Sequence, residues 1–234
     1  FAADGQLWGN PLYNWDVHLK TGCAWWIRRL RHASAVYDVV RIDHFRGFES
    51  YYAIPARDKT AVNGVWRKGP GTAFIDVIRR KLPDVRIILG YLTDDVKALL
   101  RASGFPGMKV LQFAFDSREE SDYLPHNYTQ NSVVYTGTHD NTTTADWELS
   151  APAGDVAFAR RYLDVDGGAD FTRRFIRAAL ASVSDTAVIP MPDWLGLGAE
   201  ARINTPSTLG GNWLWRMDPA ALTDALAADI LALT

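Results

Sequence analysis

The sequence predicts an α/β fold with parallel strands. Short apolar runs rich in β-branched residues recur along the chain, and segments of helical period separate them. Such alternation is typical of units in which a helix crosses from one parallel strand to the next. We count five strands, which leaves an open sheet or a truncated barrel, because a closed βα-barrel has eight. The predicted strands lie near residues 37–45, 85–90, 108–115, 132–137 and 186–190.

The first part of the chain is predicted to begin as a loop and to continue as a helix. Residues 1–16 are rich in Gly, Asn and Pro, which favour turns. Residues 22–36 place apolar side chains at helical spacing, with Trp26, Leu30 and Ala33 on one stripe. The first predicted strand follows this helix directly.

Helices also flank the second strand. The segment 69–82 is a predicted helix opened by Gly and Pro. After the strand, Thr93 is a suitable N-cap for a helix over 94–103, whose first turn holds Asp94 and Asp95. Carboxylates in that turn are favourable because a helix N-terminus carries partial positive charge.

The C-terminal third is predicted to be largely helical. Residues 155–183 have helical character with a Gly-Gly interruption at 167–168, and residues 218–232 form an Ala- and Leu-rich closing helix. No internal repeat, low-complexity tract or linker divides the sequence. We therefore expect residues 1–234 to form one domain or part of one.

Composition and charge argue against several classes of protein. The chain has 25 Lys and Arg against 27 Asp and Glu, and this net charge of −2 gives no electrostatic case for nucleic acid or an anionic membrane. No apolar run reaches the roughly 18 residues of a membrane span. Cys23 is the only cysteine, which rules out an intramolecular disulfide and a cysteine-built zinc site.

The first residues bear on localisation. They form neither a basic n-region nor an apolar h-region, so no signal peptide is predicted. Together with the single cysteine, this favours a cytoplasmic location. The chain does not start with Met, so we expect that it was processed or begins inside a longer protein.

Two of the predicted strands end in charged residues. After the first, alternation places Arg41 and Asp43 on one face, and the arginine favours the ionised form that a nucleophilic carboxylate needs. After the fourth, His139 and Asp140 precede an Asn-Thr-Thr-Thr run. Each pair alone also fits a structural role, as a salt bridge or a polar turn. Both nevertheless follow the carboxyl ends of strands, where βα-barrels place their chemistry.

Two carboxylates without a metal-binding motif suggest glycosyl chemistry. A retaining glycosidase uses a nucleophile and an acid/base whose carboxyl groups lie only about 5–5.5 Å apart. The competing interpretation is a metal site formed by Asp43, His44, His139 and Asp140. No HxH or HExxH spacing supports a metal site, so we expect neither a metal nor another cofactor.

Longer segments carry a more specific signal. They are GQLWGNPLYNW (5–15), VRIDHFRGFESYYAIPA (40–56), NGVWRKGPG (63–71), GFPGMKVLQFAFD (104–116), YLPHNY (123–128), VVYTGTHDNTTTADW (133–147) and ARINTPSTLGGNWLWR (201–216). In this order, and over nearly the whole chain, they resemble the 4-alpha-glucanotransferases, the amylomaltase or disproportionating-enzyme family of the α-amylase clan.

This resemblance implies a particular fold. The family is a TIM (β/α)8 barrel with insertions, about twice as long as this chain. By the resemblance, the chain starts after the third barrel strand and contains roughly strands 4–8. We therefore expect residues 1–234 to be the C-terminal portion of a single catalytic barrel domain.

The resemblance also implies roles for individual residues. The nucleophile of the family corresponds to Asp43, and its transition-state stabiliser corresponds to Asp140. Arg41 would steady the charge of Asp43 and help to hold the sugar. His139 would hydrogen-bond sugar hydroxyls, and Trp8 would face a glucose unit, although a tryptophan there also fits a core position. Weaker substrate-binding predictions are His44, Asp116 and Asn204.

One motif of the family is incomplete in this chain. The fifth family strand reads like IIAEDLG, and its Glu protonates the leaving oxygen, whereas here Ile88 is followed directly by Leu89. No other Glu takes its place. Three explanations stay open: an incomplete sequence, an altered sequence, and a glucan-binding relative that has lost catalysis.

The function implied by the resemblance is the transfer of α-1,4-glucan segments between maltooligosaccharides or glucans, with retention of configuration. The expected partners are α-1,4-glucans, with no role for nucleic acid or a membrane. The alternative is an inactive fragment or a glucan-binding pseudoenzyme, because the acid/base segment is missing. No pattern indicates an oligomeric state.

Overall fold

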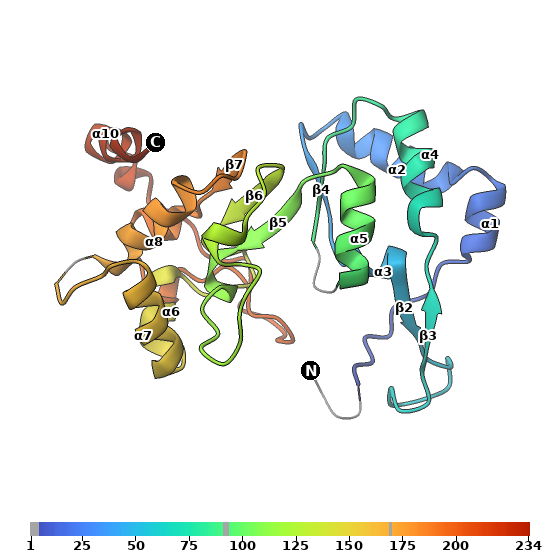
Figure 1. The fold of residues 1–234 in the computed structure, drawn as a ribbon, viewed down its shortest axis with the longest axis horizontal. Coiled ribbons are helices and arrows are strands. Elements are labelled where there is room, and N and C mark those ends of the chain that lie inside the picture. The colour runs from blue at the N-terminus through green and yellow to red at the C-terminus, as the bar shows by residue number, and fades with distance from the viewer. Residues whose placement is uncertain (1–4, 91–93, 169) are drawn as a thin grey trace. The chain divides into compact units, whose positions relative to one another are not determined.

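The computed structural model describes residues 5–90, 94–168 and 170–234. The chain divides into two compact units, residues 1–107 (unit 1) and 108–234 (unit 2). In Figure 1, unit 1 is coloured from blue to green and unit 2 from green to red. Each unit has a hydrophobic core of its own.

Unit 1 combines a pair of parallel strands with helices. Strand β1 (Val40–Ile42) runs parallel to β4 (Ile87–Leu89). The remaining elements of this unit are α1 (Trp15–Lys20), α2 (Ala24–Ser34), α3 (Arg46–Glu49), β2 (Ser50–Ala53), β3 (Val65–Lys68), α4 (Gly71–Lys81) and α5 (Asp94–Ser103).

The helices predicted for unit 1 are confirmed, whereas α1, α3 and one hairpin were not predicted, and the loop predicted over 1–16 ends where α1 begins at Trp15. α2, α4 and α5 lie within the segments 22–36, 69–82 and 94–103. Thr93 lies outside the described residues, as do the side chains of Asp94 and Asp95. The antiparallel hairpin of β2 and β3 escapes the sequence pattern because every residue of β3 is exposed, so it shows no apolar alternation.

The core of unit 1 is built on aromatic side chains. Trp26 and Leu30 are buried on α2, as their predicted stripe requires. Phe48 of α3 stacks on Phe74 of α4, with ring centroids 4.8 Å apart and an interplanar angle of 12°. Burying such rings stabilises a fold by about 25 cal/mol per Å² of apolar surface. Trp26, Phe48 and Phe74 therefore serve as core residues of this unit.

Unit 2 continues the parallel pattern. The strand order is β5 (Gly107–Val110), β6 (Ser132–Tyr135) and β7 (Thr186–Val188), with β6 and β7 parallel. The helices of this unit are α6 (Thr144–Ser150), α7 (Ala153–Tyr162), α8 (Phe171–Leu180), α9 (Met191–Trp194) and α10 (Asp224–Leu233).

Several predicted elements of unit 2 differ from the structure in length. The strand predicted over 108–115 ends at Val110, where the chain enters a 3-10 helix over Leu111–Phe113. The closing helix predicted over 218–232 begins only at Asp224. The helical segment predicted over 155–183 is confirmed as two helices, α7 and α8, on either side of the glycine interruption.

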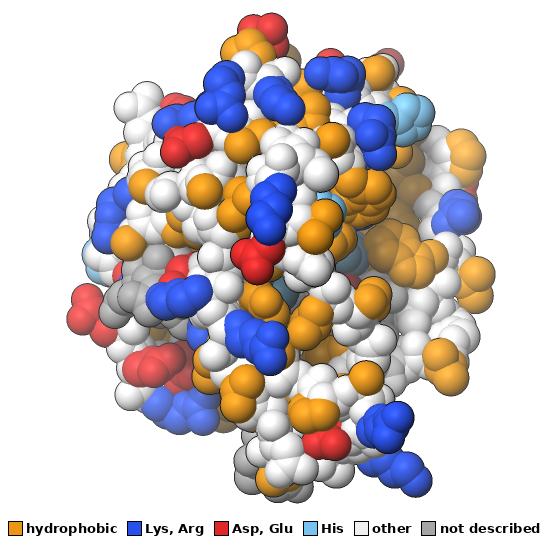
Figure 2. Space-filling model, turned by 90° about the vertical axis from the view of Figure 1, so that its right-hand side faces the viewer, with side chains coloured by type: hydrophobic (Ala, Val, Ile, Leu, Met, Phe, Trp, Pro, Cys, Tyr) orange, Lys and Arg blue, Asp and Glu red, His pale blue; other side chains and the backbone are white. Residues whose placement is uncertain are grey.

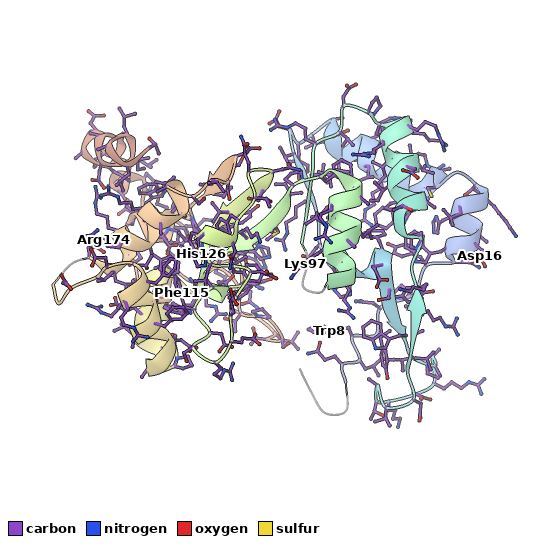
Figure 3. The ribbon with its side chains drawn as sticks, viewed as in Figure 1. Trp8, Asp16, Lys97, Phe115, His126 and Arg174 are labelled. Atoms are coloured by element: carbon purple, nitrogen blue, oxygen red, sulfur yellow. The ribbon has the colours of Figure 1, made fainter. Side chains whose placement is uncertain are left out.

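The core of unit 2 surrounds Phe115, which is labelled in Figure 3. Its ring contacts the rings of Phe158, Tyr162 and Phe175 at centroid distances of 5.6–5.8 Å. α7 and α8 supply these partners, so the sheet side of both helices is fixed by aromatic packing.

The predicted α/β class with parallel strands is confirmed. The strands that the structure describes form no closed barrel. Within the described ranges, no helix is both long enough and apolar enough to cross a membrane. On the face shown in Figure 2, Lys and Arg side chains are interspersed with hydrophobic and acidic ones.

Candidate functional site

The end of β1 places an exposed carboxylate beside a guanidinium in unit 1. Arg41 Nη2 donates a hydrogen bond to Asp43 Oδ1 over 2.6 Å. The Asp43 side chain is 80% exposed, and that of Arg41 is 30% exposed. The carboxylate is therefore open to a ligand, while its partner is held against the fold.

The register between β1 and β4 explains this geometry. Ile42 lies opposite Leu89, and both side chains are buried. Arg41 lies on the opposite face to Ile42, and Asp43 follows directly after the strand, where a hydrogen bond joins the two side chains. The Nε of Arg41 is buried and has no hydrogen-bond partner among the described residues. A buried donor of this kind is costly unless something accepts from it.

The chain turns sharply directly after Asp43. His44 has a left-handed backbone, with φ at 47°, a conformation that is uncommon for residues other than glycine. The buried Phe45 follows, and the His44 carbonyl accepts the N–H of Gly47 over 2.9 Å. This turn separates Asp43 from α3 and leaves the side chain of His44 exposed as well.

Trp8 is an exposed side chain and not a core residue of the described structure. It is 64% exposed, and its Nε1 donates to Gln6 Oε1 over 3.1 Å (Figure 3). An exposed indole offers a flat apolar face to a ligand. The core position considered for Trp8 is therefore wrong for this structure.

Strand β4 carries no carboxylate. Its three residues are apolar, and Ile87 and Leu89 are fully buried. Gly90 follows, and residues 91–93 lie outside the described residues. Among the described residues at this strand end, no acid takes the position that the missing glutamate has in the family motif.

Unit 2 has a candidate carboxylate of its own, Asp140, after β6. Asn204 Nδ2 donates to Asp140 Oδ1 over 2.7 Å, and His139 Nε2 lies 3.4 Å from the same oxygen. Arg202 Nη2 donates to the Asp140 backbone carbonyl over 2.8 Å. The side chains of His139 and Asp140 are 38% and 45% exposed, so this pair is anchored but accessible.

Trp213 packs beside His139 and was not predicted as a site residue. Its ring centroid lies 5.1 Å from that of His139, and it is 56% exposed. Its backbone has φ at 62°, and its N–H donates to the Ile203 carbonyl over 2.7 Å. The only available signal was its place in the motif over 201–216, which also holds Arg202.

Asp116, a further predicted binding residue, is engaged by a neighbour. Arg118 donates to it from its backbone N–H, from Nε over 2.8 Å and from Nη2 over 2.6 Å. These hydrogen bonds lower the pKa of the Asp116 carboxyl to about 2. Arg118 therefore occupies both carboxylate oxygens, and a role in substrate binding stays a prediction.

The described residues offer no metal site. No group of three or more His, Cys, Asp or Glu side chains among them is placed to hold an ion. Asp43 and His44 belong to unit 1, whereas His139 and Asp140 belong to unit 2. The lone thiol of Cys23 is buried, and burial raises its pKa, so it is unsuited to act as a nucleophile.

Comparison with known proteins identifies relatives that match both units. The sequence pattern of the family described as 4-alpha-glucanotransferase matches residues 1–223. The 4-alpha-glucanotransferase of Clostridium butyricum is 44% identical over 238 residues, covering 100% of this chain and 49% of that protein. The protein named "4-alpha-glucanotransferase, chloroplastic/amyloplastic" of Solanum tuberosum is 44% identical over 232 residues, covering 98% of this chain and 40% of its own length.

A solved structure also resembles this chain. An amylomaltase from Streptococcus agalactiae, in complex with acarbose, matches with a TM-score of 0.92 and 40% sequence identity. The match covers 100% of this chain and 48% of that one. The chain thus spans about half the length, or less, of the proteins it resembles.

Proposed function

The chain belongs to the 4-alpha-glucanotransferase family, and from this membership we propose that the intact protein transfers α-1,4-glucan segments between glucans or maltooligosaccharides. The observation that carries the proposal is the exposed carboxylate of Asp43, held by Arg41 at the carboxyl end of β1. A carboxylate fixed on one oxygen and open on the other suits attack on a sugar.

The proposed reaction is a double displacement. Arg41 holds Asp43 Oδ1, and Asp43 Oδ2 attacks the anomeric carbon. The bond from that carbon to the leaving glucan oxygen breaks, and the leaving oxygen takes a proton from a general acid, the role of the glutamate in the family motif that is incomplete after Ile88. In the second step, the 4-hydroxyl of an acceptor glucan attacks the anomeric carbon, loses its proton and releases Asp43. Two inversions give net retention.

Asp140 and its neighbours would act on the sugar during both steps. Asn204 fixes Oδ1 of Asp140, so that the other oxygen can face the ring, where positive charge develops. His139 would donate to a sugar hydroxyl, and the exposed rings of Trp8 and Trp213 would contact apolar faces of glucose units.

The proposed architecture is a portion of one barrel. The parallel strands β1, β4, β5, β6 and β7 would be strands 4–8 of a TIM barrel, and residues 1–234 would be the C-terminal portion of its single catalytic domain. Support comes from the share of the relatives that the chain covers and from chemistry placed at the carboxyl ends of β1 and β6. A cytoplasmic location stays a prediction.

A second candidate function rests on β4. Because its described end carries no carboxylate, the proton for the leaving oxygen has no evident donor there. The alternative is therefore a protein that binds glucans but does not complete their transfer.

The experiment that distinguishes the transferase from the glucan-binding protein uses two glycosyl donors. Maltotriose requires protonation of its leaving oxygen, whereas the fluoride of α-maltotriosyl fluoride leaves without a proton. Glucose and longer oligosaccharides formed from maltotriose would support the transferase. Fluoride release without transfer from maltotriose would support a working nucleophile that lacks its acid. Release of neither product, with maltotriose bound, would overturn the proposal in favour of a binding protein.

A further inference from the structure

Asp193 of α9 is a buried carboxylate that no step of the proposed reaction uses. It is only 3% exposed. Its Oδ1 accepts the backbone N–H of Thr144 over 2.7 Å. Its Oδ2 accepts the hydroxyl of Thr136 over 2.5 Å and that of Thr144 over 2.9 Å. All three partners are donors, as an ionised carboxylate requires.

The two threonines mark the ends of the segment that carries the candidate site. Thr136 directly follows β6, and Thr144 is the first residue of α6. Between them lies the segment 137–143, with His139 and Asp140 near its centre. One carboxylate thus ties together the exit from the strand and the entry to the helix, and it fixes the span of this segment.

Other contacts within the segment depend on that span. Asn141 Oδ1 accepts both the backbone N–H and the hydroxyl of Thr138, over 2.9 and 2.8 Å. Gln112 Nε2 donates to the Thr142 carbonyl over 2.9 Å. These contacts shape the turn. Gln112 also reaches toward both ends, because its backbone N–H donates to the Thr136 carbonyl over 3.2 Å, whereas Asp193 joins Thr136 to the first residue of α6.

Asp193 is too enclosed to contact a glucan. A cavity of about 20 Å³ lies against it, lined also by Gly137, Thr138 and Arg202 among others. Such a space admits about one water molecule and no sugar ring. Burying a carboxylate costs free energy unless hydrogen bonds compensate. The hydrogen bonds of Asp193 therefore act on the segment 137–143 and not on a ligand.

We propose that Asp193 is a positioning residue, which holds the segment 137–143 so that Asp140 and His139 face the sugar. This role rests on the proposed function. The residue acts through the backbone of the segment and through Thr136 and Thr144, and it does not touch substrate.

The test compares Asp193→Asn and Thr136→Val in the intact protein with Ser132→Ala as the matched control. Asparagine places an amide where two hydroxyls now donate, and valine deletes one of those hydroxyls. Ser132 is another buried hydroxyl at the opposite end of β6, where it bonds to Thr129 and Ser184.

Two readouts keep this proposal separate from the proposed function. The first is single-turnover fluoride release from α-maltotriosyl fluoride. We expect the rate at saturation to fall about 100-fold in Asp193→Asn and less in Thr136→Val, with the half-saturating concentration changed by less than about threefold. The second is hydrogen exchange, which needs no activity. We expect protection to be lost selectively at amides 137–143, and not in Ser132→Ala.

Defined results would overturn the positioning role. Protection at 137–143 equal to that of the parent would do so, as would a loss of protection spread evenly over unit 2. A saturated rate within about threefold of the parent in Asp193→Asn would do the same. If the parent protein releases no fluoride, the proposed function fails, and the exchange pattern alone decides whether Asp193 holds the segment.

Discussion

Asn204 Nδ2 donates a hydrogen bond to Asp140 Oδ1 over 2.7 Å, although the two residues lie 64 positions apart in the chain. A second hydrogen bond joins the same two parts of the chain, because the backbone N–H of Asn204 donates to the His139 carbonyl over 3.1 Å. Together the two bonds fix the backbone carbonyl of His139 and one carboxylate oxygen of Asp140. The remaining oxygen is thereby given a defined direction.

Replacing Asn204 by alanine should slow glycosyl transfer without unfolding the protein. The hydrogen bond that Asp140 loses is charge-assisted, but Asp140 is 45% exposed, so solvent compensates in part. We expect the rate of fluoride release from α-maltotriosyl fluoride to fall about tenfold. The matched control is Asn127→Ala, which removes an amide that bonds to the Ser121 carbonyl elsewhere in unit 2. Equal rates in Asn204→Ala and the control would contradict the assigned contact.

The nucleophile assignment predicts that Asp43→Asn abolishes fluoride release while leaving the fold intact. An amide cannot form the glycosyl ester, so the rate should fall by at least about 10³-fold. Because the Asp43 side chain is 80% exposed, the thermal midpoint should change little. Asp58→Asn is a suitable control, since Asp58 is an exposed carboxylate of unit 1 that bonds to Asn63. Activity retained in Asp43→Asn would show that another group attacks the sugar.

The pairing of Arg41 with Asp43 could be predicted because the signal there is local. The two residues are two positions apart at the end of an apolar run, and the structure joins them by a hydrogen bond. The helices α2, α4 and α5 were predictable for a similar reason, since their apolar spacing repeats within each segment.

Contacts that are distant in sequence could not be predicted in this way. Asp193 reads as an ordinary carboxylate in a Pro-Asp-Trp turn, and nothing local shows that it binds Thr136 and Thr144. Trp213 contacts His139 across more than 70 positions of sequence, and its backbone is left-handed, with φ at 62°, which no local pattern indicated.

The contact between Asp116 and Arg118 predicts a specific response to acid. The pKa of Asp116 is lowered to about 2 in the folded protein, against about 3.9 in an unfolded chain. A lowered folded-state pKa stabilises the fold above the unfolded value, and this contribution is lost as the pH falls from about 4 to about 2. We therefore expect Arg118→Ala to lower the thermal midpoint slightly at pH 6 and not at pH 2.

The control for that prediction replaces a basic residue of the same unit without disturbing Asp116. Arg173 pairs with Asp229, so Arg173→Ala removes a different exposed pair in unit 2. Direct NMR titration of the Asp116 carboxyl should give a midpoint near 2 in the parent and near the ordinary value in Arg118→Ala. A parent midpoint near 4 would contradict the three hydrogen bonds from Arg118.

The junction of Ile88 and Leu89 leads to the sharpest prediction. If the chain lacks its acid, α-maltotriosyl fluoride should still glycosylate Asp43, because fluoride leaves without a proton, and the ester should persist because no base activates an acceptor. Mass spectrometry should then show the added maltotriosyl group on the peptide containing Asp43. The same peptide from Asp43→Asn should stay unmodified. Peptides spanning residues 81–101 should show Ile88 joined to Leu89, as the sequence has it.

Inserting Ala-Glu-Asp between Ile88 and Leu89 should then restore the missing step. The glutamate would protonate the leaving oxygen and later accept the proton of the acceptor hydroxyl, which general acid–base catalysis accelerates by about 10²–10⁴-fold. We expect maltotriose disproportionation to appear and the trapped ester to turn over. Insertion of Ala-Gln-Asp is the matched control, because it has the same length and register and differs only in having an amide in place of the glutamate carboxyl. If both insertions restore disproportionation equally, strand length rather than the carboxyl limits the reaction, and the assignment of the missing acid/base is wrong.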